Sequence, residues 1–180
     1  MVDVPARSGG GLLDVDCSTA TSCTVRCARG SNCGDVRCGT GACEVQCAFS
    51  CRGIDCTSAS TCKATCLQDA CTGAIACGGS RCDFLCSQQS ASCFSSQPIV
   101  CSAASCFIDC TGANVAACLG RTITCTGGSC DVRLPPACSN ITVDCSGATA
   151  CQVLDATTAC PVQCPAGCDA GCTSSGVCGL

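Results

Sequence analysis

The chain has 180 residues, the size of a single domain, and 30 of them are Cys, whereas His, Trp and Tyr are absent and only four are Phe. The aromatic residues that usually fill a core are therefore nearly missing, and a cysteine content this high indicates a disulfide scaffold formed in oxidising surroundings. The net charge of −4 excludes a basic nucleic-acid-binding surface, and no apolar run approaches the roughly 20 residues that span a bilayer.

The chain begins with a segment that contains no cysteine. Residues 1–14 are predicted to form an N-terminal extension or cap. They contain no basic stretch followed by an apolar one, so no signal peptide is visible in them. Residues 15–178 are predicted to form one domain, because a single repeat runs through all of them.

Two short motifs alternate along this domain and place its cysteines in four columns. Cysteines that end an apolar-x-Cys motif form column one: Cys17, Cys38, Cys56, Cys77, Cys101, Cys125, Cys145 and Cys164. Cysteines that begin the Cys-x-apolar-x-Cys motif form column two: Cys23, Cys43, Cys62, Cys82, Cys106, Cys130, Cys151 and Cys168. Cysteines that end that motif form column three: Cys27, Cys47, Cys66, Cys86, Cys110 and Cys172. The remaining cysteines form column four: Cys33, Cys51, Cys71, Cys93, Cys118, Cys138, Cys160 and Cys178.

The period of the repeat predicts the fold. Consecutive column-one cysteines are 18 to 24 residues apart. Each repeat holds two segments with apolar residues at every second position, which is typical of strands, separated by runs of Gly, Ser, Ala and Thr that favour turns. We therefore predict an all-β protein, a flattened β-solenoid with two strands per coil and about eight coils, stacked about 4.8 Å apart.

The alternation also predicts the disulfide pairing. In Cys-x-Val-x-Cys the two cysteines share the inward face but lie about 13 Å apart along the strand, too far for a bond to each other. We expect each to bond across its own coil, column one with column two and column three with column four. The predicted pairs of columns one and two are Cys17–Cys23, Cys38–Cys43, Cys56–Cys62, Cys77–Cys82, Cys101–Cys106, Cys125–Cys130, Cys145–Cys151 and Cys164–Cys168. The predicted pairs of columns three and four are Cys27–Cys33, Cys47–Cys51, Cys66–Cys71, Cys86–Cys93, Cys110–Cys118 and Cys172–Cys178.

Two alternatives stay open for the cysteines. Bonds between neighbouring coils also fit the geometry, since a step of about 4.8 Å lies within disulfide range. Leu134 and Asp155 stand at two column-three positions, so Cys138 and Cys160 have no partner in their own coils and either bond to each other or stay free. No two cysteines are closer than four positions, which argues against a metal cluster. We expect no metal and no cofactor.

Outward positions of neighbouring strands carry opposite charges. The two predicted rows of alternating charge are Asp16, Arg37, Asp55 and Glu44, Lys63, Asp83. If the coils stack in register, unlike charges become neighbours, which favours that register over others.

The arrangement of inward cysteines along residues 15–178 resembles the architecture of the insect hyperactive antifreeze proteins, which carry a Thr-x-Thr array on one face. Thr122-Ile123-Thr124 matches that array locally. The cysteine repetition is also similar to that of cysteine-rich surface proteins of some bacteria and protists. The first resemblance implies ice binding, and the second implies a structural role.

The middle coils carry a candidate interface. Leu85 and Phe107 point outward on adjacent strands, and Phe94 and Leu119 lie in longer turns. Together they would form an exposed apolar patch, which usually marks an interaction site. In the alternative arrangement, Phe94 and Leu119 fold inward and cap the widened coils.

These observations favour a non-enzymatic, rigid structural, coat or surface protein, whose partners are other subunits of a coat, fibre or surface layer. Without His and with one Lys, the chain lacks the usual activators of a catalytic nucleophile, so no catalytic residues are expected. We expect no nucleic acid and no membrane insertion, and a location outside the cell, at its surface, or in an oxidised particle. The alternative functions are ice binding and adhesion through the middle coils.

Overall fold

A computed structural model describes residues 1–4, 12–48, 51–67, 70–86, 93, 95–111, 117–135, 140–154 and 162–163. All regular elements in these ranges are β-strands. No helix long and apolar enough to cross a membrane occurs among these residues.

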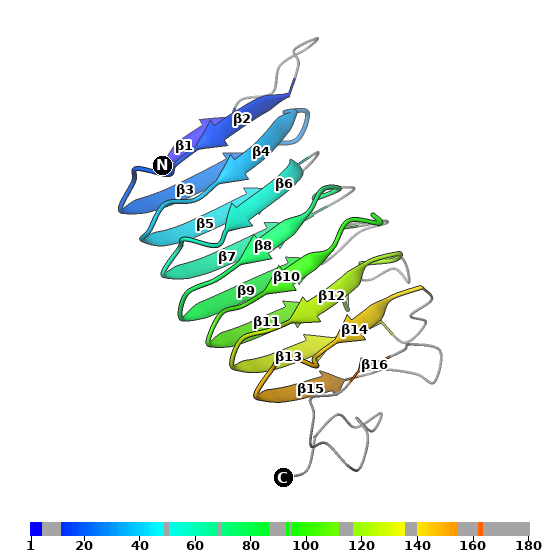
Figure 1. Cartoon of the computed structure of the whole chain (residues 1–180). Helices are drawn as coiled ribbons and strands as arrows, with labels where there is room; N and C mark the ends of the chain where they lie inside the picture. Colours follow the sequence, from blue (N-terminus) through cyan, green and yellow to red (C-terminus); the bar gives the residue numbers. More distant parts are fainter. Residues whose placement is uncertain are drawn as a thin grey trace.

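The strands form two parallel sheets of eight strands each, and consecutive strands of the chain alternate between them (Figure 1). Sheet A contains β1 (Val2–Val4), β3 (Ser22–Cys27), β5 (Ala42–Cys47), β7 (Thr61–Cys66), β9 (Arg81–Cys86), β11 (Ser105–Asp109), β13 (Ser129–Arg133) and β15 (Ala150–Leu154). Sheet B contains β2 (Leu13–Asp16), β4 (Cys33–Arg37), β6 (Cys51–Cys56), β8 (Ile75–Cys77), β10 (Ile99–Cys101), β12 (Thr122–Cys125), β14 (Thr142–Asp144) and β16 (Val162–Gln163).

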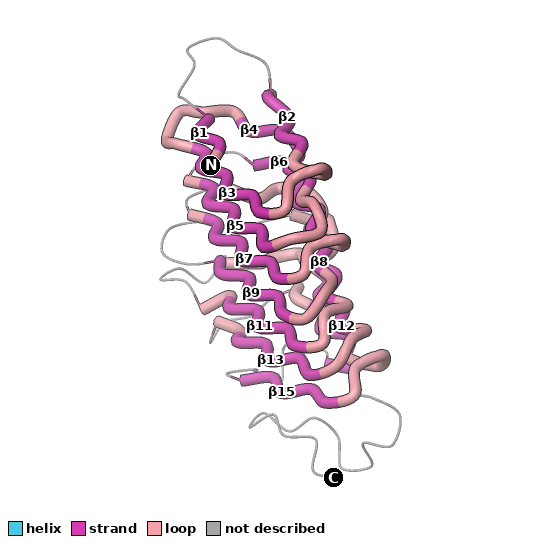
Figure 2. Tube along the Cα trace, turned by 90° about the vertical axis from the view of Figure 1, so that its left-hand side faces the viewer, coloured by secondary structure: helices cyan, strands magenta, loops and turns pink. Residues whose placement is uncertain are grey.

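This arrangement is a β-solenoid with two strands per coil, and the predicted fold class is confirmed. Figure 2 shows the two columns of strands joined by turns along the length of the molecule. Seven of the eight predicted repeats have both strands, from β2–β3 to β14–β15, and β16 is the described strand of the last repeat. One strand was not foreseen: β1 lies within the predicted extension and pairs with β3, Val2 opposite Val25.

Burial follows the predicted alternation. In β5, Ala42, Glu44 and Gln46 are exposed, whereas Cys43, Val45 and Cys47 are buried. Neighbouring strands stack like residue on like residue, so that Cys23 pairs with Cys43 and Val25 with Val45. The core is therefore a narrow stack of small aliphatic side chains, flanked on both sides by a row of cysteine sulfur atoms. Phe84 is a larger side chain in this stack, and the residue paired with it on β7 is the smaller Ala64.

Twelve disulfides occur among the described residues, each within one coil, with Cα–Cα distances of 5.8–6.3 Å. Seven join column one to column two: Cys17–Cys23, Cys38–Cys43, Cys56–Cys62, Cys77–Cys82, Cys101–Cys106, Cys125–Cys130 and Cys145–Cys151. Five join column three to column four: Cys27–Cys33, Cys47–Cys51, Cys66–Cys71, Cys86–Cys93 and Cys110–Cys118. These pairs follow the within-coil scheme, and no disulfide between coils occurs in the described ranges.

The remaining cysteines lie outside the described residues: Cys138, Cys160, Cys164, Cys168, Cys172 and Cys178. Of the two column-three positions that lack a cysteine, position 134 lies within the described residues. Leu134 is fully buried, so an apolar side chain occupies the inward position that a cysteine takes in most other coils.

The predicted charge rows stack in register. Arg37 of β4 pairs with Asp16 of β2 and with Asp55 of β6. On sheet A, Lys63 pairs with Glu44 and Asp83. Lys63 Nζ lies 3.9 Å from Glu44 Oε1, and both side chains are about half exposed (52% and 57%). Exposed pairs of this kind contribute little stability but disfavour a shifted register.

Candidate functional site

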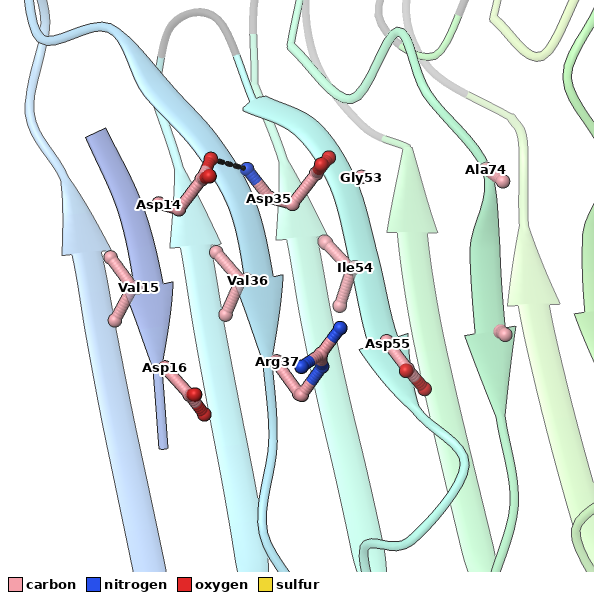
Figure 3. Close-up of a pocket in the computed structure, with 11 residues that line it drawn as sticks. Asp14, Val15, Asp16, Asp35, Val36, Arg37, Gly53, Ile54, Asp55 and Ala74 are labelled. Carbon is pink, nitrogen blue, oxygen red and sulfur yellow. Dashed lines mark hydrogen bonds between the residues drawn. The ribbon is translucent and has the colours of Figure 1, made fainter. Parts of the chain in front are cut away.

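A shallow groove crosses the outer face of sheet B over β2, β4 and β6 (Figure 3). Its volume is about 560 Å³, and its lining includes Gly53, Ala74 and Ala76, whose small side chains leave room above the sheet. The alternation of the strands turns the polar residues of this region toward solvent. The carboxylates of Asp14, Asp16, Asp35 and Asp55 line the groove together with Arg37.

Local hydrogen bonds hold these carboxylates. Asp14 Oδ1 accepts a hydrogen bond from the backbone N–H of Asp35 at 2.8 Å, which Figure 3 shows at one end of the groove. Asp35 in turn faces Arg52, with Nη2 to Oδ2 at 3.5 Å. The groove is acidic, but its charges are largely partnered within the sheet, so it can offer electrostatic attraction to a basic surface rather than a preformed ion site.

A second pattern, which the sequence analysis did not single out, recurs where strands end. In an Asp-Cys-Ser/Thr sequence the aspartate side chain accepts the backbone N–H two residues later, which closes an Asx turn. This occurs at Asp16–Ser18, Asp55–Thr57, Asp109–Thr111 and Asp144–Ser146, with distances of 2.9 to 3.1 Å.

Two of these aspartates have a shifted pKa. The hydrogen bond from the Ser18 backbone lowers the pKa of Asp16 below its usual value. Hydrogen bonds from the Ser146 side chain and backbone lower that of Asp144. Both carboxylates are therefore more strongly acidic than usual, and the turns that they close are expected to weaken in acid.

The outer face of sheet B changes character along the molecule. On β8, β10 and β12 the outward residues Ala76, Val100 and Thr124 are uncharged and stand in register. Thr122 pairs with Thr142 on β14. Thr124, however, pairs with Asp144 on β14, so the uncharged stretch of sheet B ends at β12. This stretch is the surface that bears on the ice-binding alternative.

The predicted interface of the middle coils is assembled in part. Leu85 of β9 and Phe107 of β11 lie on the outer face of adjacent strands, two positions apart along the strand direction. Both are half-buried, as is Leu119, which lies in a turn instead of on sheet A. Phe94 lies outside the described residues. The structure therefore places Leu85 and Phe107 on one patch, whereas Leu119 lies in the turn that precedes β12 of the other sheet.

Charged groups modify this patch. The guanidinium carbon of Arg133 lies 5.0 Å from the Phe107 ring centroid, within range of a cation–π interaction. Phe107 also pairs with Asp83 on one side and Asp131 on the other. Asp131 Oδ1 is shielded from solvent and has no hydrogen-bond partner among the described residues. The patch is thus a small mixed surface and not a continuous apolar one.

Arg121, which the sequence analysis missed, is buried between the coils, with 1% of its surface exposed. Its Nε donates to the Cys93 carbonyl at 2.6 Å, and its Nη1 donates to the Gly73 and Gln97 carbonyls at 2.8 Å each. Its Nη2 donates to the Cys71 carbonyl. The side chain thereby joins the turns that precede β8, β10 and β12, and burial lowers its pKa to about 10.

One sequence signal could have identified this residue. Arg121 stands two positions before the inward Ile123, and in a strand such positions share a face. The structure thus places an arginine in the widened coils, where the sequence analysis considered Phe94 and Leu119 as inward caps.

Comparisons with known proteins add no relative. No protein-family model matches the chain, and no curated protein or solved structure matches it. The resemblance to antifreeze proteins and to cysteine-repeat surface proteins is therefore a resemblance of architecture, a cysteine-rich β-solenoid with internal disulfides.

Proposed function

We propose that the protein is a non-enzymatic structural component, a subunit of a coat, fibre or surface layer. A rigid, disulfide-rich β-solenoid fits a structural or surface role. The observation that carries the proposal is the regular placement of disulfides at both ends of successive coils. Such a rod keeps its shape without a large core.

The energetics support this role. Each disulfide joins residues four to eight positions apart, and closing so short a loop contributes about 2 kcal/mol through the entropy of the unfolded chain. The contributions are not additive, but they replace part of the hydrophobic burial that a narrow rod lacks. Because the disulfides hold the two sheets together in each coil, we expect resistance to bending and to proteolysis.

The disulfides also bear on location. So many bonds form and persist in an oxidising compartment, which supports an extracellular or surface location or a particle matured by oxidation. The partners in this proposal are further protein subunits. The acidic groove on sheet B would attract a basic surface of such a subunit, whereas the net charge of −4 disfavours nucleic acid.

Electron microscopy combined with sedimentation tests this proposal. The oxidised protein is examined over a range of protein and salt concentrations, and a reduced and alkylated sample serves as the control. We expect ordered filaments or shells from the oxidised sample and none from the control. A monomer at all concentrations, together with saturable binding to an unrelated ligand, would contradict the assembly role.

Ice binding is the second candidate, favoured by the uncharged in-register residues on β8, β10 and β12. Its test is thermal hysteresis with faceted ice crystals. The variant Val100→Lys places a charge in the middle of this stretch and should abolish the effect, whereas Thr24→Lys on sheet A should not. Absence of hysteresis in the parent protein would rule out this candidate.

Adhesion through the middle coils is a third candidate, supported by Leu85 and Phe107 on one face. It predicts saturable binding to a cell or matrix surface that Phe107→Ala weakens. The matched control is Leu154→Ala, a half-buried residue on the same sheet at β15. Equal binding by both variants would rule out this surface.

A further inference from the structure

Neighbouring coils bring the sulfur atoms of different disulfides close together. Cys38 Sγ lies 3.2 Å from Cys56 Sγ, although Cys38 is bonded to Cys43 and Cys56 is bonded to Cys62. This is a non-bonded contact between the disulfides of two successive coils, and all four cysteines are buried.

The same proximity recurs along the rod. Several groups of three sulfur atoms, each made of one disulfide and one cysteine of an adjacent coil, have all their members within 4.8 Å of one another. In columns one and two these groups are Cys38, Cys43, Cys56 and Cys77, Cys82, Cys101. In columns three and four they are Cys27, Cys47, Cys51; Cys66, Cys71, Cys93; and Cys86, Cys93, Cys118.

The backbone accommodates disulfides within a coil and also between neighbouring coils. Cysteines of one column stand in register on adjacent parallel strands, as in the pairing of Cys56 with Cys77 and of Cys77 with Cys101. Strands in a sheet are about 4.8 Å apart, and a disulfide needs a Cα–Cα distance of about 4.4–6.8 Å. Between cysteines of one column, such as Cys38 and Cys56, a bond between coils therefore requires side-chain rotation and little backbone movement. Bonds that join column three to column four of the next coil, such as Cys66–Cys93, are supported by the closeness of their sulfur atoms.

We propose that the two rows of cysteine sulfur atoms support intramolecular thiol–disulfide exchange from coil to coil. A cysteine left without a partner attacks, as its thiolate, the nearest sulfur of the neighbouring disulfide. The new bond links the two coils, and the other sulfur of the attacked disulfide leaves as a thiolate, which takes up the proton given up by the first. The number of disulfides and of thiols is unchanged, so no oxidant or reductant takes part.

In columns three and four the exchange can proceed in two steps. A thiol at Cys66 would attack Cys93 and release Cys86. Cys86 lies within 4.8 Å of Cys118 and would attack it in turn, which releases Cys110. At the next coil Leu134 occupies column three, so the path along that column ends there. An unpaired thiol is thus moved away from the coil in which it arises, and the coils that it passes become covalently linked.

Burial favours this internal reaction over reaction with external thiols. The cysteines of columns three and four in this path are fully buried, so small thiols and alkylating agents reach them poorly. The neighbouring disulfide, in contrast, is held at a high effective concentration by the fold. This property of the rod holds whether or not the protein assembles into a coat.

The variant Cys43→Ala tests the single step, because it leaves Cys38 unpaired beside Cys56. The folded protein is incubated at a pH of about 8.5, where an ordinary thiol is half ionised. It is then quenched in acid, unfolded with a maleimide present, and mapped without reduction. We expect a Cys38–Cys56 peptide, together with alkylation of Cys62 that is raised about tenfold or more over the double variant Cys38→Ala/Cys43→Ala, which lacks the attacking thiol. The parent protein, treated in the same way, gives the background.

A second variant, Cys71→Ala, tests the two-step path and covers a failure of the first variant to fold. The label should appear at Cys86 and Cys110, with a Cys66–Cys93 peptide. Label confined to Cys38 in the first variant and to Cys66 in the second, with neighbouring disulfides intact, would overturn the proposal. Label spread over cysteines of distant coils would also overturn it, because that pattern arises from scrambling in an unfolded chain.

Discussion

Arg121 is the residue whose replacement should affect the stability of the rod most clearly without touching a cysteine. It is fully buried, and its guanidinium donates to the carbonyls of Cys71, Gly73, Cys93 and Gln97. These four carbonyls belong to the turns of two coils, and Arg121 itself belongs to a third. Arg121→Met keeps an unbranched apolar stem but removes every donor, so the variant leaves the four carbonyls without this partner.

The expected loss can be estimated from these contacts. A hydrogen bond to a charged group contributes roughly 1.5–3 kcal/mol, and an acceptor left unpaired in a buried site costs roughly 1–3 kcal/mol. Four such bonds to one side chain are not additive, and removing a buried charge returns part of its desolvation cost. We therefore expect Arg121→Met to lower the free energy of unfolding by about 3 kcal/mol, which corresponds to a decrease in Tm of about 6–12 °C for a chain of this length.

Unfolding is followed by far-ultraviolet circular dichroism, with the disulfides intact, because the chain has no Trp or Tyr for fluorescence. The matched control is Arg26→Met, an arginine exposed on β3, which should change the stability by less than about 0.5 kcal/mol. If Arg121→Met is as stable as Arg26→Met, the bridging of three coils by Arg121 does not stabilise the protein and the reasoning is wrong.

Three further predictions concern the core, a close approach and a turn. Phe84→Ala, in the apolar stack of the core, should cost about 3–5 kcal/mol in thermal or guanidinium unfolding, and a smaller loss for Phe84→Leu would attribute the cost to volume. Gly41→Ala should cost more than about 2 kcal/mol, because a Cβ there would overlap the Thr21 carbonyl oxygen; unchanged stability would refute the close approach. Asp144 has a lowered pKa in the folded state, so its contribution to stability is present above its ordinary pKa of 3.8 and is lost as the pH falls through the folded pKa. The difference in Tm between the parent and Asp144→Asn should therefore shrink in acid, and a constant difference would contradict this.

The architecture could be predicted because the cysteine spacing gives both the length of the repeat and the side of each strand that faces the core. Cys23 and Cys27 share a face but are too far apart to bond to each other, which directs each bond to the end of its own coil. The same columns predict the register, since any slip by one residue would turn the cysteines outward. The fold and the within-coil pairs of the described coils therefore follow from spacing and elementary geometry.

Other features could not be predicted in the same way. β1 contains no cysteine and belongs to no repeat, and an alternation over only three residues, Val2–Val4, is too short to predict a strand or its pairing with β3. The environment of Arg121 depends on which carbonyls the turns bring together, with contacts up to 50 residues away in the chain. Leu85 and Phe107 lie on adjacent strands and Leu119 in a turn, as the repeat predicts, but the contact of the Arg133 guanidinium with the Phe107 ring depends on side-chain conformations that the spacing does not give.

The central claim is that disulfides at the two ends of each coil hold the rod together. Peptide mapping of the oxidised protein without reduction tests it most directly, with the free thiols blocked at acid pH before digestion to prevent exchange. We predict the twelve within-coil pairs, from Cys17–Cys23 through Cys145–Cys151, as the dominant bonded peptides. A map dominated by bonds between coils, or by free thiols at these positions, would contradict the claim.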